Sequence, residues 1–316
     1  MVPVIEIKDL AKYFSVPAGK NLAVDGVSLK IERGKTMGVV GESGCGKSTL
    51  GRTIIRLYEP TSGQILLNGE DVSHAKGAQL KKARENMQII FQDPYSSLNP
   101  RMTVEETVSE PLEISHKYKS KAEIMDKMRE LFHRVGIDKR YRLAYPHEMD
   151  GGRRQRVGIA RAIALNPEFV MCDEPVSALD VSVQAQVLNL LMDLQEQYQL
   201  TYMFVTHDLS VVKHISDHIS VMYLGQLVET SPSKELFANP LHPYTKALLS
   251  AIPSIDIHRP MQRKILKGEL TSAINPKPGC RFAPRCEFAT ESCSAPQGLQ
   301  EVGTDHFVSC CRINEI

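Results

Sequence analysis

The chain has 316 residues, a formal net charge of +1, 42% hydrophobic residues and 24% charged residues. This composition is ordinary for a globular protein, and the length predicts one large domain with an appendage. A near-neutral charge argues against a protein with a broad basic face for nucleic acid. The apolar runs are too short to span a bilayer and the N-terminus does not resemble a signal peptide, so we expect a cytosolic chain that reaches membranes only through partners.

The N-terminal part of the chain is predicted to be rich in strands. Residues 4–10 and 23–31 alternate, imperfectly, between apolar and polar side chains, as half-buried strands do. Shorter apolar runs predict further strands at 36–40, 65–67 and 87–91. The pattern therefore favours a sheet-containing fold from the start of the chain.

The middle of the chain predicts an α/β core with a helical insertion. Residues 102–135 are rich in Glu, Lys and Met at helical spacing, and we expect Pro111 to interrupt the helix there. The unbroken apolar runs 169–172 and 202–205 are typical of central parallel strands that are covered on both faces. Between them, residues 183–198 repeat apolar positions on one side, which predicts an amphipathic crossover helix.

A glycine-rich loop at residues 41–49 is the most informative motif. It reads Gly-Glu-Ser-Gly-Cys-Gly-Lys-Ser-Thr, follows a short β-type run and leads into a predicted helix. In that context the backbone N–H groups and the positive helix end converge on a phosphate group. Lys47 is expected to reach the β- and γ-phosphates of a nucleotide, and Ser48 to hold Mg²⁺. The residues predicted to bind the nucleotide here are Gly41, Ser43, Gly44, Cys45, Gly46, Lys47, Ser48 and Thr49. An ordinary glycine-rich turn is the alternative.

A second chemical centre is predicted where an apolar strand ends in Asp173 and Glu174. Successive strand side chains point to opposite sides, so the two carboxylates can take different roles. Asp173 is the candidate to hold Mg²⁺, directly or through water, and Glu174 to polarise the attacking water. An acidic pair also begins many ordinary loops, and that alternative stays open.

Together with these two motifs, three more occur in an order that resembles the nucleotide-binding domains of ABC transporters. Gln92 matches the Q-loop, residues 177–180 (Ser-Ala-Leu-Asp) match the D-loop, and His207 matches the switch histidine. The resemblance covers essentially the whole chain. It narrows to the ATPases of dipeptide, oligopeptide and nickel importers, and among them to the F-type subunit. The segments that carry this narrower resemblance are 41–52, 91–100, 222–225 and 239–245.

The resemblance implies a P-loop ABC-type fold with a nucleotide-binding domain at 1–239, a helical subdomain at about 95–165 and a Cys-rich C-terminal extension at 240–316. It also implies ATP and Mg²⁺, with Ser48, Gln92 and Asp173 around the metal and Glu174, His207 and Gln92 in catalysis. Phe14 is assigned as the aromatic residue that stacks on adenine, with Tyr13 as the second choice. A plain core role is the alternative for either aromatic residue.

The signature motif departs from the family pattern. The family has Leu-Ser-Gly-Gly-Gln, and the matching residues here are Met149-Asp150-Gly151-Gly152-Arg153. The resemblance implies that Asp150, Gly151 and Gly152 face the γ-phosphate of an ATP held by a second ATPase subunit. A carboxylate about 5 Å from phosphate costs on the order of 3 kcal/mol at an effective dielectric of about 20, part of which Arg153 can offset. Alternatively, Asp150 serves only as the N-cap of the following helix.

The seven cysteines are unevenly distributed. Cys45 and Cys172 are predicted to be small buried thiols. After about Pro240, where we place a domain boundary, the chain becomes rich in Pro and Cys. A cytosolic protein seldom keeps structural disulfides, so the C-terminal cysteines indicate metal. The resemblance implies a 4Fe-4S cluster on Cys280, Cys286, Cys293 and Cys310. Zinc is the alternative, although zinc motifs usually begin with shorter pairs. Cys311 is predicted to be a spare thiol, and residues 239–245 a rigid connector.

The resemblance implies the ATPase subunit of an importer for peptides or a related small solute, at the cytoplasmic face of the cell membrane. Its implied partners are a second ATPase subunit, expected to be a paralogous D-type chain, two transmembrane permease subunits that dock near Gln92 and the helical region, and an extracytoplasmic substrate-binding protein; no nucleic acid is expected. One alternative is a soluble ABC ATPase that acts on nucleic acid or ribosomes. Another is a non-catalytic ATP-binding partner domain, because of the altered signature.

Overall fold

The computed structural model describes residues 2–252, 272–313 and 315. Their contacts divide the chain into two compact units, which we describe separately. The helical unit comprises residues 1–5, 31–35 and 66–203, and the phosphate-loop unit comprises residues 6–30, 36–65 and 204–316. Residues on both sides of position 240 therefore belong to the same compact unit.

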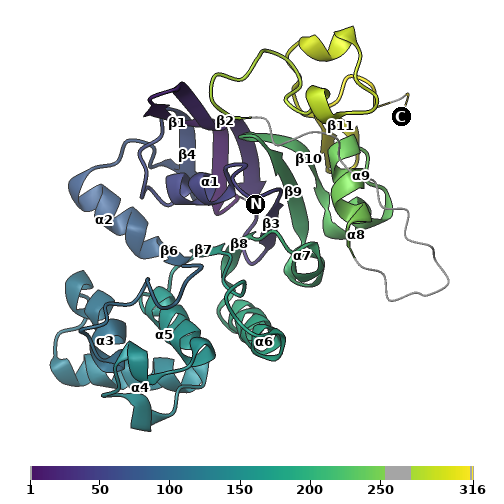
Figure 1. The fold of residues 1–316 in the computed structure, drawn as a ribbon. Coiled ribbons are helices and arrows are strands. Elements are labelled where there is room, and N and C mark those ends of the chain that lie inside the picture. The colour runs from purple at the N-terminus through teal and green to yellow at the C-terminus, as the bar shows by residue number, and fades with distance from the viewer. Residues whose placement is uncertain (1, 253–271, 314, 316) are drawn as a thin grey trace. The chain divides into compact units, whose positions relative to one another are not determined.

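The described residues form strands and helices, most of which are labelled in Figure 1. The strands are β1 (Ile5–Val16), β2 (Gly19–Ile31), β3 (Thr36–Val40), β4 (Ser62–Leu67), β5 (Glu70–Asp71), β6 (Met87–Ile90), β7 (Phe169–Asp173), β8 (Thr201–Val205), β9 (His218–Tyr223), β10 (Gln226–Pro232), β11 (Gln300–Gly303) and β12 (His306–Val308). The helices are α1 (Lys47–Ile54), α2 (Gly77–Asn86), α3 (Val104–Ser115), α4 (Lys121–Val135), α5 (Gly151–Ile163), α6 (Val181–Tyr198), α7 (Leu209–Ile215), α8 (Ser233–Ala238) and α9 (Pro243–Ser250). The expected α/β class is confirmed.

The helical unit contains α3, α4 and α5, which pack on one another (Figure 1). Local sequence signals mark the start of α3 and both ends of α4. Thr103 and Glu106 form a capping box at the start of α3, in which each side chain accepts the other residue's backbone N–H. The Ser120 hydroxyl caps α4, and Gly136, with φ of 68°, ends it in the left-handed region that glycine adopts at little cost.

The expectation that Pro111 interrupts the helical region is wrong. Pro111 lies inside α3, which runs on to Ser115. A proline removes one backbone hydrogen bond from a helix and strains the preceding turn. Here Val104, Val108 and Leu112 are buried on one face of α3, and this packing outweighs the local cost.

Within the helical unit, β6 and β7 run parallel with Met87 opposite Phe169 and Ile90 opposite Cys172. All residues of β7 are buried, as the unbroken apolar run predicts for a central strand. The predicted crossover helix is α6, whose buried residues lie at helical spacing. They are Val187, Leu188, Leu190, Leu191 and Leu194. The position of β7 brings Asp173 to the carboxyl end of a buried parallel strand.

The phosphate-loop unit is built on a sheet in which the strands follow the order β11-β12-β10-β9-β3. β3 runs parallel to β9, with Met37 opposite His218 and Val40 opposite Val221. β9, β10, β12 and β11 pair antiparallel. The last strands of the chain therefore extend the sheet that carries β3, the strand from which the glycine-rich loop leaves.

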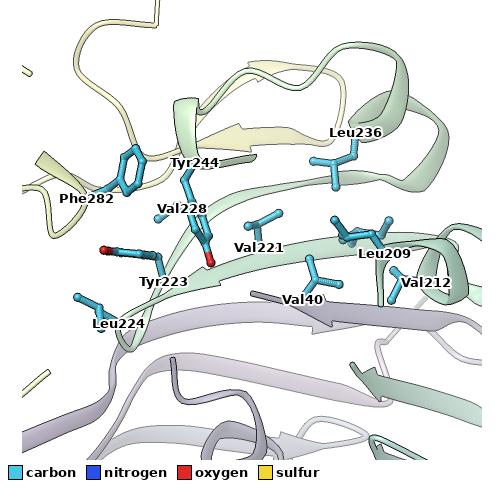
Figure 2. Close-up of a cluster of buried hydrophobic side chains, with 11 residues drawn as sticks. Val40, Leu209, Val212, Val221, Tyr223, Leu224, Val228, Leu236, Tyr244 and Phe282 are labelled. Carbon is cyan, nitrogen blue, oxygen red and sulfur yellow. The ribbon is translucent and has the colours of Figure 1, made fainter. Parts of the chain in front are cut away.

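An aromatic cluster joins the C-terminal region to this sheet (Figure 2). The Tyr223 ring lies 4.7 Å from the Tyr244 ring and 5.3 Å from the Phe282 ring, measured between centroids. All three side chains are buried. Burying an aromatic side chain contributes roughly 2 kcal/mol or more. The C-terminal region is thus part of the core of the phosphate-loop unit.

Candidate functional site

The glycine-rich loop lies between β3 and α1, as the sequence predicts. Gly41 and Gly46 have φ angles of 152° and 108°, which favour glycine. A Cβ atom would lie 2.1 Å from the Met222 carbonyl oxygen at Gly41 and 2.0 Å from the Ala23 carbonyl oxygen at Gly46. Side chains at these two positions would collide with the backbone, so the loop requires both glycines for its close packing.

The loop directs positive charge and backbone dipoles to the start of α1. The ammonium group of Lys47, which is 4% exposed, donates to the carbonyls of Gly41 at 2.8 Å and Glu42 at 3.0 Å. Ser48 and Thr49 follow in the first turn of α1, which contains no acidic residue. Ser43 and Gly44 are exposed. A helix start of this kind favours an anion.

Cys45 and Cys172 are both buried, as predicted. Burial raises the pKa of each thiol, although the nearby Lys47 ammonium opposes that rise at Cys45. Both side chains are therefore neutral packing groups at physiological pH.

The structure brings together the predicted Q-loop glutamine and the predicted catalytic base. The Gln92 amide Nε2 donates to Glu174 Oε2 at 3.0 Å, within the helical unit. Asp173, the preceding residue, is fully buried at the end of β7. Glu174 has φ of 47°, an uncommon conformation for a residue with a side chain and one that clusters at functional sites. Its carbonyl accepts from the Ser177 N–H at 3.3 Å and the Ser177 hydroxyl at 3.1 Å, which joins it to the D-loop.

The altered signature motif forms a regular helix start. Asp150 is the N-cap of α5 and accepts the Arg153 backbone N–H at 2.8 Å. The Arg153 guanidinium also donates to the second oxygen of Asp150 at 2.6 Å. The capping role expected for Asp150 is therefore confirmed, and its charge is paired. A Cβ atom at Gly152 would lie 2.6 Å from Val183 Cγ1, so a larger residue there would displace the Val183 side chain.

The predicted switch histidine and adenine-binding residue lie in the phosphate-loop unit. His207 is exposed and follows β8, directly before the N-cap Asp208 of α7. The Phe14 ring, in β1, is half-buried and meets the Tyr58 ring edge-on at 5.6 Å. The Tyr13 hydroxyl donates to Asp25, and burial together with this hydrogen bond raises the pKa of Tyr13 to about 12. The assignment of adenine to Phe14 stays a prediction.

The C-terminal cysteines gather in one small region. Burial raises the pKa of Cys280 to about 11, and the neighbouring thiols Cys293 and Cys286 add to the rise. Burial also raises the pKa of Cys286, and Cys310 and Cys293 add to that rise in the same way. The Cys293 and Cys311 sulfurs lie 4.0 Å apart, so Cys311 is not remote from the other thiols. No three His, Cys, Asp or Glu side chains among the described residues are close enough together to hold a single metal ion.

Three residues that shape the glycine-rich loop are not predicted from the sequence. Glu42, within the loop, contacts Tyr244 of α9 and Arg285 of the C-terminal region. Tyr244 belongs to the segment predicted as a rigid connector, so that segment is more than a connector. No local sequence pattern predicts these contacts, because the partners lie far apart in sequence.

The sequence matches two known protein families. Residues 24–177 match the family described as ABC transporter, and residues 228–293 match the family described as oligopeptide/dipeptide transporter, C-terminal region. The oligopeptide transport ATP-binding protein AppF of Bacillus subtilis (strain 168) is 50% identical over 319 residues, which cover 97% of this chain and 96% of AppF. The chain belongs to the ABC ATPase family. The protein is an ATP-binding transport subunit.

Further relatives of this ABC ATPase agree with that assignment. The oligopeptide transport ATP-binding protein OppF of Bacillus subtilis (strain 168) is 57% identical over 253 residues, or 80% of this chain and 83% of OppF. Among solved structures, the ATP-binding cassette MJ0796, a dimer bound to ADP and Pi, has a TM-score of 0.67 and 28% identity and covers 72% of this chain and 98% of its own. Among the described residues, no helix is long and apolar enough to cross a membrane.

Proposed function

We propose that this ABC ATPase powers the import of peptides, or of a related small solute, from the cytoplasmic face of the cell membrane. The observation that carries this proposal is the match of residues 228–293 to the C-terminal region of oligopeptide and dipeptide transporters. The names of the relatives, oligopeptide transport ATP-binding proteins, support the same class of substrate.

We assign the chemistry to the motifs whose geometry is described above. Lys47 and the N–H groups at the start of α1 bind the phosphates, and Glu174 accepts a proton from the attacking water. The hydrogen bond from Gln92 orients the Glu174 carboxylate. Mg²⁺, when bound, neutralises charge on the phosphates, and Ser48, Gln92 and Asp173 are the residues proposed to hold it. His207 is proposed to act at the γ-phosphate.

A cavity in the helical unit supports docking of a permease. The cavity has a volume of about 420 Å³ and lies among residues of α2, β6, α3 and α5. Apolar side chains such as Ile89 and Ile114 line it together with the charged Arg84, Glu110 and Arg161. An apolar groove with charged groups suits a short helix from a membrane subunit. We propose that two permeases, a second ATPase subunit of D-type and an external binding protein complete the importer.

The C-terminal thiols are proposed to hold a 4Fe-4S cluster. Cys280, Cys286, Cys293 and Cys310 lie in one small region, where burial and neighbouring thiols raise the pKa values of Cys280, Cys286 and Cys310. Their long spacing in the sequence favours the cluster over zinc, because zinc motifs usually begin with shorter pairs. Protein purified without oxygen should contain about four irons and four sulfides per chain. One zinc and no sulfide would overturn the cluster.

A transport assay tests the proposed function. The complex would be reconstituted with its permeases and second ATPase in vesicles, and ATP-dependent uptake of a labelled peptide mixture would be measured with the binding protein present. We expect uptake that Lys47→Ala abolishes. ATP hydrolysis that responds to RNA or DNA but not to the binding protein would instead support the soluble nucleic-acid or ribosome enzyme.

A further inference from the structure

Glu42 is held at three of its groups, although it is not one of the residues expected to contact phosphate. Its backbone N–H donates to the Tyr244 hydroxyl at 2.8 Å. Its backbone carbonyl accepts from the Lys47 ammonium at 3.0 Å. Its carboxylate accepts two hydrogen bonds from Arg285, at 2.7 and 3.1 Å. Two of these three contacts come from the part of the chain that follows β10.

The ion pair of Arg285 with Glu42 has the geometry of a strong interaction. The guanidinium donates through both terminal nitrogens to both carboxylate oxygens, the paired arrangement that arginine and carboxylates favour. The Arg285 side chain is 7% exposed and that of Glu42 22%, so water screens the pair only partly. Exposed ion pairs contribute little, whereas a pair at this depth fixes the positions of both partners.

The loop that carries Arg285 is itself fixed by packing and by backbone hydrogen bonds. It lies in the short loop 280–286, in which Phe282 packs on Tyr223 and Tyr244 in the aromatic cluster (Figure 2). Backbone hydrogen bonds close this loop, from Ala283 to Cys280 and from Arg285 to Phe282. The same loop begins and ends with two of the C-terminal cysteines. The C-terminal region therefore places a cation against the glycine-rich loop.

The pair also resolves an electrostatic conflict. A carboxylate in a loop that binds a polyphosphate repels its ligand, at a cost on the order of 1 kcal/mol or more for charges a few ångström apart. Arg285 neutralises the Glu42 carboxylate from the side of the C-terminal region. Tyr244 and Arg285 together also limit the freedom of the loop, so less conformational entropy is lost when ATP binds.

We propose that Arg285 and Tyr244 are positioning residues for ATP binding: they hold and neutralise Glu42, and so make the C-terminal region a working part of the ATP site. The inference rests on the proposed use of the phosphate loop for ATP, and it adds residues that the family motifs do not contain.

Nucleotide affinity is the readout that tests this inference. Binding of a fluorescent ATP analogue with Mg²⁺ would be titrated on the full chain for the parental protein, Arg285→Gln and Tyr244→Phe. We expect Arg285→Gln to raise the Kd by about tenfold and Tyr244→Phe by roughly threefold. In the assembled complex, the KM for ATP should rise in parallel while kcat stays within about twofold, because neither residue acts on the reacting atoms.

A second substitution separates positioning from general stability. In the Arg285→Gln background, Glu42→Gln removes the unneutralised carboxylate, so the double variant should recover part of the lost affinity. Arg312→Gln is the matched control: it removes an ion pair with Glu315 and a hydrogen bond to Phe288 in the same C-terminal region, and neither partner belongs to the phosphate loop. We expect its Kd to stay parental.

Each outcome has a distinct meaning. If the parental chain binds ATP, Lys47→Ala does not, and Arg285→Gln binds as the parental chain does, the inference is wrong and the proposed function stands. If Arg285→Gln and Arg312→Gln lose affinity equally, or Glu42→Gln restores nothing, Arg285 only stabilises the fold. If the parental chain binds no ATP, the proposed function itself fails.

Discussion

Asp150 occupies the signature position where the family has a hydroxyl, and the structure pairs its charge with Arg153. Both side chains of the pair are about half exposed, so the pair adds little to stability. We expect its importance to be electrostatic: Arg153 reduces the negative charge that Asp150 would present to the nucleotide of a second ATPase subunit, as proposed for the signature position. The side chain also keeps the role that a serine would have at the start of α5, because both are good N-caps.

Substitutions at Asp150 and Arg153 separate charge from capping. We expect Asp150→Ser to leave stability unchanged and to leave the ATPase rate of the complex unchanged or raised. Asp150→Ala should cost about 1 kcal/mol of stability through loss of the cap. Arg153→Gln exposes the carboxylate and should lower the ATPase rate several-fold, and adding Asp150→Ser should restore it. A large loss of ATPase activity in Asp150→Ser alone would show that the carboxylate has a positive role.

At the level of secondary structure, the buried carboxylate of Glu229 in β10 joins three segments. It is fully buried and accepts from the backbone N–H groups of Leu241 and His242 at 2.8 and 2.9 Å. It also lies 2.8 Å from His306 Nε2 in β12. The carboxylate therefore holds β12 and the start of α9 against the same strand.

Removing this carboxylate should loosen the C-terminal region. Glu229→Ala leaves three donors, two of them buried, without this acceptor. We expect a loss of about 3 kcal/mol in the free energy of unfolding, measured with urea. Glu229→Gln keeps one acceptor and should lose less. Glu235→Ala is a suitable control, since Glu235 is exposed and bonds only to Asn239 among the contacts described. Equal losses at positions 229 and 235 would contradict this account.

His242 is expected to make the start of α9 sensitive to acid. Its Nδ1 accepts the Tyr244 backbone N–H at 3.1 Å, and burial lowers the pKa of His242 to about 3, with the nearby Lys246 adding to the effect. Because the folded pKa lies below the unfolded value of about 6.5, the unfolded chain takes up the proton first. The contribution of His242 to the free energy of unfolding is therefore nearly constant above pH 6.5 and is expected to fall as the pH drops from there towards 3.

A histidine-free cap tests this pH dependence. His242→Asn retains a side-chain acceptor for the cap but does not titrate. Between pH 6.5 and 4.5 the parental chain should lose about 2 kcal/mol more of its unfolding free energy than the variant does. His147→Asn, at an exposed position of the helical unit, should leave the acid slope unchanged. If the slopes of the parental chain and His242→Asn coincide, His242 is not the acid-sensitive group.

Across the whole molecule, the features that the sequence predicts correctly are those encoded by a few neighbouring residues. The glycine-rich loop, the buried strand before Asp173 and the apolar face of α6 each leave a signal within a few residues, and all three are confirmed. Pro111 misled because the packing of α3 decides its path, not the local propensity. The pair of Glu42 with Arg285 spans 243 positions, so only the folded sheet brings the partners together.

The boundary predicted near Pro240 stays a prediction. A change in composition suggested a separate C-terminal domain, yet Tyr244 and Phe282 pack into the core that carries the phosphate loop. Composition reports what a segment is made of and not what it packs against.

Glu174 is proposed to be the general base of ATP hydrolysis, and the ATPase rate of Glu174→Gln tests this role most directly. The assembled complex with this substitution should bind ATP with parental affinity and retain it, while turnover falls by at least about a hundredfold, as expected when a general base is removed. Hydrolysis at the parental rate would contradict the assignment of Glu174 as the base and, with it, the catalytic role proposed for its hydrogen bond with Gln92.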